Sequence, residues 1–285
     1  HPFSQNIRSD TLFNMTSNIN IGLIGFGNVG QGVFSIIKDN QSVISQRIGR
    51  NVCIKKIGVR SIDKYSHLVD PALLTNRIDD IINDETIDII VEVIGGETPA
   101  FDYIMAALNN KKYVVTANKN LIAKHKQTFF NTALKNNVDI FFEASVGGGI
   151  PIIKSFKVGY SANSIQSVYG ILNGTTNYIL TQLSENQMDY ITALKQAQNL
   201  GFAEADPTAD VSGQDAAYKI VILTAVALKV DIQVDDVYVE GIEKITLTDV
   251  NYCNELGYSI QLIGKASQQP SGIFVAVYPT AIESN

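Results

Sequence analysis

The sequence of 285 residues contains little cysteine and little histidine. Its two cysteines, Cys53 and Cys253, are too far apart for the spacing of a metal or redox motif. The three histidines, His1, His67 and His125, form no cluster in the sequence. This argues against a zinc site and against a serine-type triad, because both usually need a positioned imidazole. We interpret the cysteines as unpaired thiols of a protein from a reducing compartment.

Clustered positive charge and long apolar runs are also missing. The net charge is −6, whereas a nucleic-acid surface needs clustered Lys and Arg. A membrane span needs roughly 18 apolar residues, and the longest candidate, IVILTAVAL after Lys219, is far shorter. The N-terminal residues show no basic region followed by an apolar stretch, as a signal peptide would. We therefore expect a soluble cytoplasmic protein that binds neither nucleic acid nor membrane.

Short apolar, β-branched runs alternate with segments of helical spacing over residues 19–145. This alternation is typical of a parallel sheet covered by helices on both faces. We predict an α/β nucleotide domain of the Rossmann type over residues 17–145. The predicted strands are INIGLIG, NVCIKKIGV, IDIIVEVIGG, YVVTA and DIFFEAS.

The pattern changes after Val146, where predicted strands and helices no longer alternate. The predicted strands of this part are SIQSVYGIL, QLIGKAS and GIFVAVYPTAI. We predict an α+β substrate and dimerisation domain over residues 146–285. Residues 1–16 are expected to be a tag or a disordered extension, with Met15 as a candidate natural start.

The motif GFGNVG, residues 25–30, follows the first predicted strand and opens a predicted helix, as in a dinucleotide-binding site. Gly25 would permit the tight turn, Gly27 would let the backbone approach a pyrophosphate, and Gly30 would let helix and strand pack closely. The alternative is a glycine-rich turn without a ligand. The predicted cofactor contacts of this motif are Gly25, Phe26, Gly27, Asn28, Val29 and Gly30.

The end of the second predicted strand reads GVRSIDK, in which Arg60 comes first and Asp63 and Lys64 follow. An acid at this place would bond the ribose hydroxyls of NAD, whereas an arginine suits the 2′-phosphate of NADP. We therefore favour NADP, with NAD possible. The alternative is that Arg60 is an exposed surface charge.

The segment GFAEADPTADVSGQDAAYK, residues 201–219, concentrates acids and ends in a lysine. Ser212 is placed to cap a helix that begins near Gly213, so that Asp215 and Lys219 would lie at i and i+4 on one face. One interpretation is a surface ion pair that contributes about 0.3–0.5 kcal/mol. The helix continues into an apolar run, however, and a buried Asp–Lys pair is costly unless it is used or fully hydrogen-bonded.

The same segment supplies three more carboxylates without a matching set of cations. They are Glu204, Asp206 and Asp210. Such a group can hold a ligand ammonium, and Lys219 can then act as acid or base on a ligand oxygen.

This segment resembles the substrate-site signature of the homoserine dehydrogenases. So do TANKNLIA (116–123), EASVGGGIPIIK (143–154) and GILNGTTNYIL (170–180). Together with GFGNVG they occur in the family's order, and the resemblance runs from about residue 19 to 281. It implies an NAD(P)-dependent enzyme that interconverts L-homoserine and L-aspartate 4-semialdehyde in threonine, methionine and isoleucine biosynthesis. It also suggests a homodimer formed through the second domain.

The resemblance implies residue roles as well. Lys219 would give a proton to the aldehyde oxygen during reduction and take it back during oxidation. Lys119 would be a second lysine near the nicotinamide and the reacting oxygen, the alternative being a solvated loop lysine. The implied substrate contacts are Glu204, Asp210, Asp215, Gly174 and Thr175. The further implied cofactor contacts are Gly95, Thr116, Lys119 and Gly201.

The stretch EASVGGGI has successive glycines that expose backbone carbonyls, which suit a hard cation with oxygen ligands. The resemblance implies a structural monovalent ion here, usually sodium, at Glu143, Val146, Gly148 and Ile150. The alternative is a turn between the two domains that holds no ion.

The family commonly continues, after the last strand predicted here, with a glycine-rich segment that returns to the nucleotide domain. This sequence ends in YPTAIESN, so we expect that segment, and part of the cofactor site with it, to be missing. We expect no feedback control through an ACT-type or kinase domain. Two alternatives stay open: another amino-acid dehydrogenase of similar plan, such as aspartate dehydrogenase, and a non-catalytic NAD(P)-sensing module.

Overall fold

A computed structural model describes residues 18–284 of the chain, so the expected tag or extension at residues 1–16, with Met15, lies outside the described residues. The chain divides into two compact units. The first unit contains the described residues up to Thr116 together with Phe130–Phe141, and the second contains Ala117–Phe129 and the described residues from Phe142 onward. The domain boundary at residue 145 stays a prediction.

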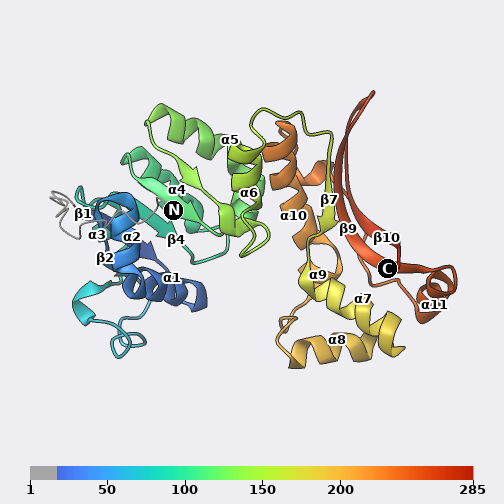
Figure 1. The fold of residues 1–285 in the computed structure, drawn as a ribbon. Helices are drawn as coiled ribbons and strands as arrows, with labels where there is room; N and C mark the ends of the chain where they lie inside the picture. Colours follow the sequence, from blue (N-terminus) through green and yellow to red (C-terminus); the bar gives the residue numbers. More distant parts are fainter. Residues whose placement is uncertain (1–17, 285) are drawn as a thin grey trace, which may run out of the picture. The chain divides into compact units, whose positions relative to one another are not determined.

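The first unit contains a six-stranded sheet in the order β3-β2-β1-β4-β5-β6. Its strands β1, β2 and β4 are labelled in Figure 1. Every pairing in this sheet is parallel, which confirms the predicted Rossmann-type sheet. The strands are β1 (Asn18–Ile24), β2 (Asn51–Gly58), β3 (Leu74–Thr75), β4 (Ile89–Glu92), β5 (Tyr113–Thr116) and β6 (Ile140–Phe141). In this order the connections reverse direction between β1 and β4, which is where open α/β sheets bind ligands beyond the carboxyl ends of their strands.

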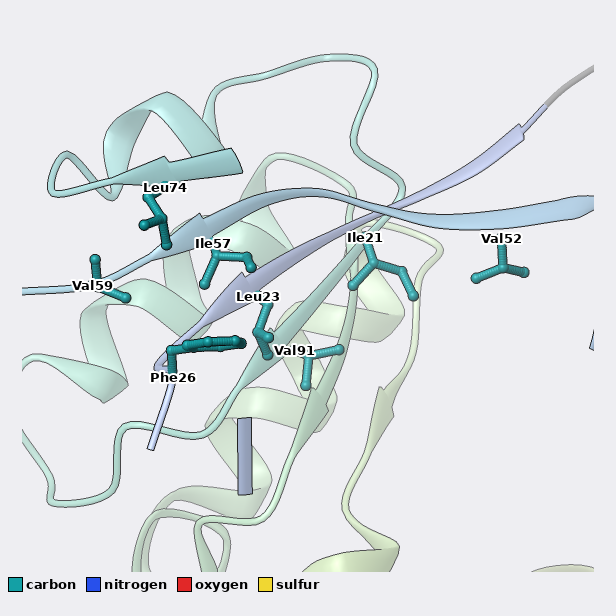
Figure 2. Close-up of a cluster of buried hydrophobic side chains, with 8 residues drawn as sticks. All are labelled: Ile21, Leu23, Phe26, Val52, Ile57, Val59, Leu74 and Val91. Atoms are coloured by element: carbon teal, nitrogen blue, oxygen red, sulfur yellow. The ribbon is translucent and has the colours of Figure 1, made fainter. Parts of the chain in front are cut away.

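Helices α1 and α2 pack against β2, and α4 packs against β4 and β5. The helices of the first unit are α1 (Asn28–Asp39), α2 (Gln41–Ile48), η1 (Pro71–Leu73), α3 (Asp79–Ile82), α4 (Ala100–Asn109) and the last part of α5 (Lys119–Lys135). Figure 2 shows eight side chains of the core, which come from β1 to β4 and from the residues after β1 and β2. Leu23 and Ile57 among them are completely buried, and each such side chain contributes about 1.5–3 kcal/mol.

The second unit contains a four-stranded sheet in the order β7-β9-β10-β8, and helix α10 packs against β9 and β10. Strand β9 pairs antiparallel with β7 and β10, whereas β8 pairs parallel with β10. The strands are β7 (Ser167–Ile171), β8 (Tyr238–Val239), β9 (Tyr258–Gln269) and β10 (Gly272–Glu283). Its helices, besides the first part of α5, are η2 (Glu143–Ser145), α6 (Ile152–Lys154), η3 (Ser155–Gly159), α7 (Gly174–Asn186), α8 (Tyr190–Asn199), α9 (Thr208–Val211), α10 (Gln214–Leu223), η4 (Thr224–Leu228), η5 (Val234–Asp236) and α11 (Leu247–Glu255).

This mixed sheet with its helices confirms the predicted α+β class of the second part. Among residues 18–284, no helix has the length and apolar character that crossing a membrane requires.

Candidate active site

The turn between β1 and α1 is built from the glycines of GFGNVG. Gly25 has φ +105°, a conformation that side chains rarely adopt. A Cβ atom on Gly30 would lie 2.2 Å from the carbonyl oxygen of Gly25, so the helix approaches the turn too closely for any side chain. A Cβ atom on Gly27 would meet no heavy atom within 4 Å, so the space in front of this backbone is open. The first turn of α1 carries no acidic residue, which leaves its N-terminus available to an anion.

A cavity of about 430 Å³ lies beside this turn within the first unit. Arg60 and Lys64 line it, and no Asp or Glu is found among the described residues that do so. Both cations are exposed to solvent, so a phosphate can reach them. Our prediction did not assign Lys64 to the site, although its place four residues after Arg60 was a signal for it. The other lining residues are Ile24, Gly25, Phe26, Gly27, Gly58, Val59, Ser61, Tyr65, Asn76, Ile78, Val93, Ile94, Pro99 and Tyr103.

The remaining predicted cofactor contacts of the first unit do not line this cavity. Asn28 and Val29 form the exposed start of α1. Gly95 has φ +69° in the segment after β4. Thr116 ends β5, and its hydroxyl donates to Oε2 of the fully buried Glu92 at 2.7 Å.

In the second unit, helix α10 carries Asp215 and Lys219 one turn apart, but its start differs from our prediction. The N-cap position is Gly213, with φ +86°, and no side chain caps the helix. Ser212 has helical dihedral angles because it closes the preceding helix α9. The predicted Ser212 cap is therefore wrong, since a capping residue needs a non-helical conformation to turn its side chain back onto the helix.

The carboxylate of Asp215 lies between two lysines. Lys219 Nζ donates to Asp215 Oδ2 at 2.6 Å and to the backbone oxygen of Leu172 at 2.7 Å, while Lys119 Nζ lies 3.0 Å from Asp215 Oδ1. The predicted pairing at i and i+4 is confirmed, and it is not a surface pair, since Asp215 is buried. Burial alone would raise the pKa of Asp215. The charge and hydrogen bond of Lys219, the hydrogen bond of Asn173 and the charge of Lys119 nevertheless hold this pKa below its ordinary value.

Asn173, Asp210 and Thr175 extend this cluster. The amide Nδ2 of Asn173 donates to Asp210 Oδ1 at 2.7 Å and to Asp215 Oδ2 at 2.8 Å. The hydroxyl of Thr175 lies 2.5 Å from the backbone oxygen of Phe202 and 3.2 Å from Asp210 Oδ2. A cavity of about 630 Å³ in the second unit opens onto these groups. Its lining residues are Asn173, Gly174, Thr175, Asn177, Tyr178, Thr181, Gly201, Phe202, Asp210, Asp215 and Lys219.

The structure thus brings together most of the predicted substrate residues but not all the acids of the segment. Glu204 is exposed and does not line the cavity, so its contact with substrate stays a prediction. Asp206 serves its own turn, because its carboxylate accepts from the backbone N–H and the hydroxyl of Thr208, and these bonds lower its pKa. Our prediction did not assign Asn173, which is the N-cap of α7; an Asn near the start of a helix is a typical signal for this position.

In the segment predicted to hold an ion, some of the candidate ligand oxygens already accept hydrogen bonds and others do not. Glu143 accepts the backbone N–H groups of Ile153 and Lys154 at 2.8 and 2.9 Å, so its carboxylate faces the start of α6. The backbone oxygens of Val146 and Gly148 accept no hydrogen bond from the described residues, which leaves them available as ligands. The oxygen of Ile150 already accepts the N–H of Ile152 at 2.8 Å.

Comparison with known proteins gives concordant matches over both units. The family model for the homoserine dehydrogenase NAD-binding domain matches residues 25–143, and that for homoserine dehydrogenase matches residues 151–285. Homoserine dehydrogenase of Bacillus subtilis is 44% identical over 265 residues, which are 93% of this chain and 61% of that protein. The chain therefore spans about three fifths of the length of this curated relative.

Solved structures agree. A homoserine dehydrogenase from Thiobacillus denitrificans superposes with a TM-score of 0.90 at 43% identity, covering 94% of this chain and 62% of that one. A hyperthermophilic archaeal homoserine dehydrogenase in complex with NADPH gives a TM-score of 0.79 at 26% identity, covering 94% of this chain and 83% of that one. By these matches and by the motifs that build its two cavities, the chain belongs to the homoserine dehydrogenase family.

Proposed function

We propose that the protein transfers a hydride reversibly between L-homoserine and L-aspartate 4-semialdehyde with NADP or NAD, in the biosynthesis of threonine, methionine and isoleucine. The observation that carries this proposal is the buried Asp215 carboxylate with a lysine at each oxygen, in a cavity that also exposes Asp210. This arrangement offers an ammonium-binding acid and a proton-transferring amine within one small space.

Lys219 is the acid and base of this proposal. An ammonium group has three N–H donors, and Lys219 uses two of them, one on Asp215 and one on the backbone oxygen of Leu172, its two partners among the described residues. One N–H remains for the oxygen of the substrate. Asp215 holds the amine in place, so that the amine can accept a proton from the homoserine hydroxyl or return it to the aldehyde oxygen.

The substrate amino group is assigned to the acids. Asp210 has no cationic partner among the described residues, and a carboxylate in that state suits an incoming ammonium. Asp215 and Glu204 are the further acids of this proposal, and Gly174 and Thr175 line the same pocket. Lys119 acts on the reacting oxygen as a second cation.

The first unit is assigned to the cofactor, which supplies the hydride acceptor when bound. The open space at Gly27 suits a pyrophosphate, and Arg60 and Lys64 suit a 2′-phosphate, so we favour NADP. The related archaeal enzyme solved with NADPH supports the same assignment. Gly95, Thr116 and Gly201 remain proposed contacts, as does a monovalent cation, preferably sodium, at Glu143 and the backbone oxygens that follow it.

The homodimer is proposed through the sheet of the second unit. Tyr169 on β7, Lys265 on β9 and Tyr238 on β8 lie in one row across the sheet with Ala276. Tyr169 and Tyr238 are 72% and 60% exposed, so this row presents apolar rings to solvent, and a second copy would cover them. A cytoplasmic location stays a prediction.

One assay tests the function. The protein in its full natural length is mixed with L-homoserine and NADP⁺ or NAD⁺, and the absorbance of reduced nicotinamide is followed. We expect turnover, with NADP⁺ preferred or both used. Lys219→Ala should lower kcat about 100- to 10,000-fold, since it removes the proton-transferring group, while cofactor binding measured by fluorescence is largely kept.

The outcomes separate the alternatives. A folded protein without homoserine turnover would reject the function, and turnover of aspartate instead would identify the other dehydrogenase. Cofactor binding without turnover of any amino acid would identify the sensing module. A Lys219→Ala variant with a near-normal rate would reject the role of Lys219 alone.

A further inference from the structure

Asn173 makes every hydrogen bond that its side chain can make. It is 4% exposed and lies between the end of β7 and the start of α7. Its Oδ1 accepts the backbone N–H of Thr176 at 2.8 Å and the hydroxyl of Thr176 at 3.1 Å, which caps α7. Its Nδ2 gives one N–H to Asp210 and the other to Asp215. The orientation of the amide follows from this chemistry, because carboxylates only accept and the Thr176 N–H only donates.

The two carboxylates on Nδ2 would otherwise repel each other. Asp215 faces the ammonium groups of Lys219 and Lys119, whereas Asp210 has none among the described residues. A bridging amide lets two acids share one small volume, because each receives a donor without a further charge.

Asn173 also acts on the pair formed by Asp215 and Lys219. Oδ2 of Asp215 receives the N–H of Asn173 at 2.8 Å and that of Lys219 at 2.6 Å. The preceding residue, Leu172, accepts the second N–H of Lys219 at 2.7 Å. The adjacent residues Leu172 and Asn173 therefore hold both Lys219 and Asp215 in place. The charged groups that face Lys219 here are Asp215 on its own helix, Lys119 on α5 and, through Asn173, Asp210 on α9.

We propose that Asn173 is a positioning residue for the reaction, which aligns Asp210 and Asp215 for the substrate and fixes the acceptor that orients Lys219. This inference rests on the proposed function. It assigns to Asn173 an action on the acid–lysine cluster in addition to the capping of α7.

Two substitutions separate these actions. Ser and Asp both cap helices well, so Asn173→Ser and Asn173→Asp keep an acceptor for the Thr176 N–H but lose both N–H donors. We expect kcat/KM for homoserine to fall about 10- to 100-fold in each, as for the loss of a hydrogen bond to a charged group. The KM for the cofactor should stay near its wild-type value. The melting temperature of Asn173→Ser should stay within a few degrees of wild type, since the cap is kept, whereas that of Asn173→Asp should fall further, because a third carboxylate then faces Asp210 and Asp215.

The pH profile supplies a second readout. Without the Asn173 donors, Asp215 loses one of the hydrogen bonds that hold its pKa below the ordinary value, so this pKa should rise. The acidic limb of kcat/KM for homoserine oxidation should therefore move to higher pH, and further in Asn173→Asp, which adds a charge, than in Asn173→Ser. As a matched control, Asn186→Asp adds the same charge at the exposed end of α7 and should leave the profile unchanged.

A measurement without turnover keeps the two proposals distinguishable. The rate at which an amine-reactive reagent acylates Lys219, read by peptide mass spectrometry, should differ from wild type in both variants, since the acceptor that orients this amine has changed. Wild-type protein without homoserine turnover rejects the function, whatever Asn173 does. The inference about Asn173 is overturned if the wild type is active and both variants keep its kcat/KM, pH profile and acylation profile. It is also overturned by variants that lose thermal stability but whose folded fraction retains wild-type kcat/KM, since Asn173 would then be a cap alone.

Discussion

Two lysines of the second unit, Lys126 and Lys219, differ in how many of their three N–H donors are already used in hydrogen bonds or ion pairs. Lys126 is 2% exposed, and its ammonium meets the backbone oxygens of Ala123 and Ile232 and the carboxylate of Asp231, at 2.7–3.0 Å. These partners use all three N–H groups, so the amine has no donor left for a ligand. Lys219 has two partners among the described residues and lines a cavity. The difference in free donors, rather than burial, supports the assignment of Lys219 to proton transfer.

At the same scale, Arg60 and Lys64 should decide the choice of cofactor. Arg60→Ala should raise the dissociation constant of NADP about 10-fold or more and that of NAD much less, because only NADP carries the 2′-phosphate. Lys64→Ala should act in the same direction with a smaller effect. Titration of each variant with both reduced cofactors, followed by fluorescence, measures this. Arg47→Ala removes a charge from α2, away from the cavity lining, and serves as control. Equal losses for NADP and NAD in Arg60→Ala would remove the inference.

At the scale of elements, the turn from β1 to α1 combines two glycines with opposite surroundings. The backbone of Gly25 fills the space beside Gly30, whereas the space beside Gly27 is empty of protein atoms. The first arrangement serves packing, and the second leaves room for a ligand.

A pair of alanine substitutions should therefore give opposite results. Gly30→Ala places a Cβ atom 2.2 Å from a backbone oxygen and should lower the free energy of unfolding by about 1–3 kcal/mol. Gly27→Ala should leave the melting temperature near wild type and weaken cofactor binding, since its methyl group projects into open space. Thermal melting and cofactor titration on both variants measure these effects. A Gly27→Ala protein that binds NADP as well as wild type would show that the pyrophosphate lies elsewhere.

At the scale of elements, some strands and caps could be predicted from the sequence and others could not. Short, mostly apolar runs such as residues 19–24 and the glycine pattern after them predict the parallel sheet, because strands buried on both faces are mostly apolar. Strands β3 and β8 contain two residues each, which is too short to show an apolar run or an alternation. The Ser212 cap failed for a related reason. Ser212 takes its conformation from the short helix α9, which it closes, and the residues of α9 show no helical pattern in the sequence.

Within the candidate site, the motifs identified which residues gather but not how each is used. Asp210, Asp215, Lys119 and Lys219 meet as expected. Asp206, equally acidic in the same segment, instead turns to Thr208 two residues away. Such a local choice depends on backbone geometry, which composition and spacing do not carry.

For the molecule as a whole, the exposed face of the second sheet bears on assembly. Phe274 on β10 pairs with Ser267 on β9, two residues along from the row that contains Tyr169, and it is 41% exposed. Rings on alternate residues of neighbouring strands share one face. This face therefore extends across β7, β9 and β10, and a second copy would remove it from water.

Tyr169→Asp should convert the proposed dimer into monomers, because it replaces an apolar ring of the proposed interface with a charge that would have to give up its water there. Sedimentation equilibrium of wild type and variant measures the change. Tyr252→Asp introduces the same charge at an exposed ring on α11 and should leave the assembly unchanged. If wild type is monomeric at all concentrations, or if the Tyr169→Asp variant remains dimeric, the proposed interface is wrong.

The amine of Lys219 is held in part by the main chain, since Leu172 offers its carbonyl oxygen and not its side chain. A point substitution at position 172 exchanges the side chain but cannot delete that oxygen. Homologues can therefore diverge at this residue while they retain the anchor, provided that the path of the backbone is conserved. Inheritance of this contact depends on the shape of a loop rather than on the identity of an amino acid, and comparison of residue types at position 172 alone would overlook it.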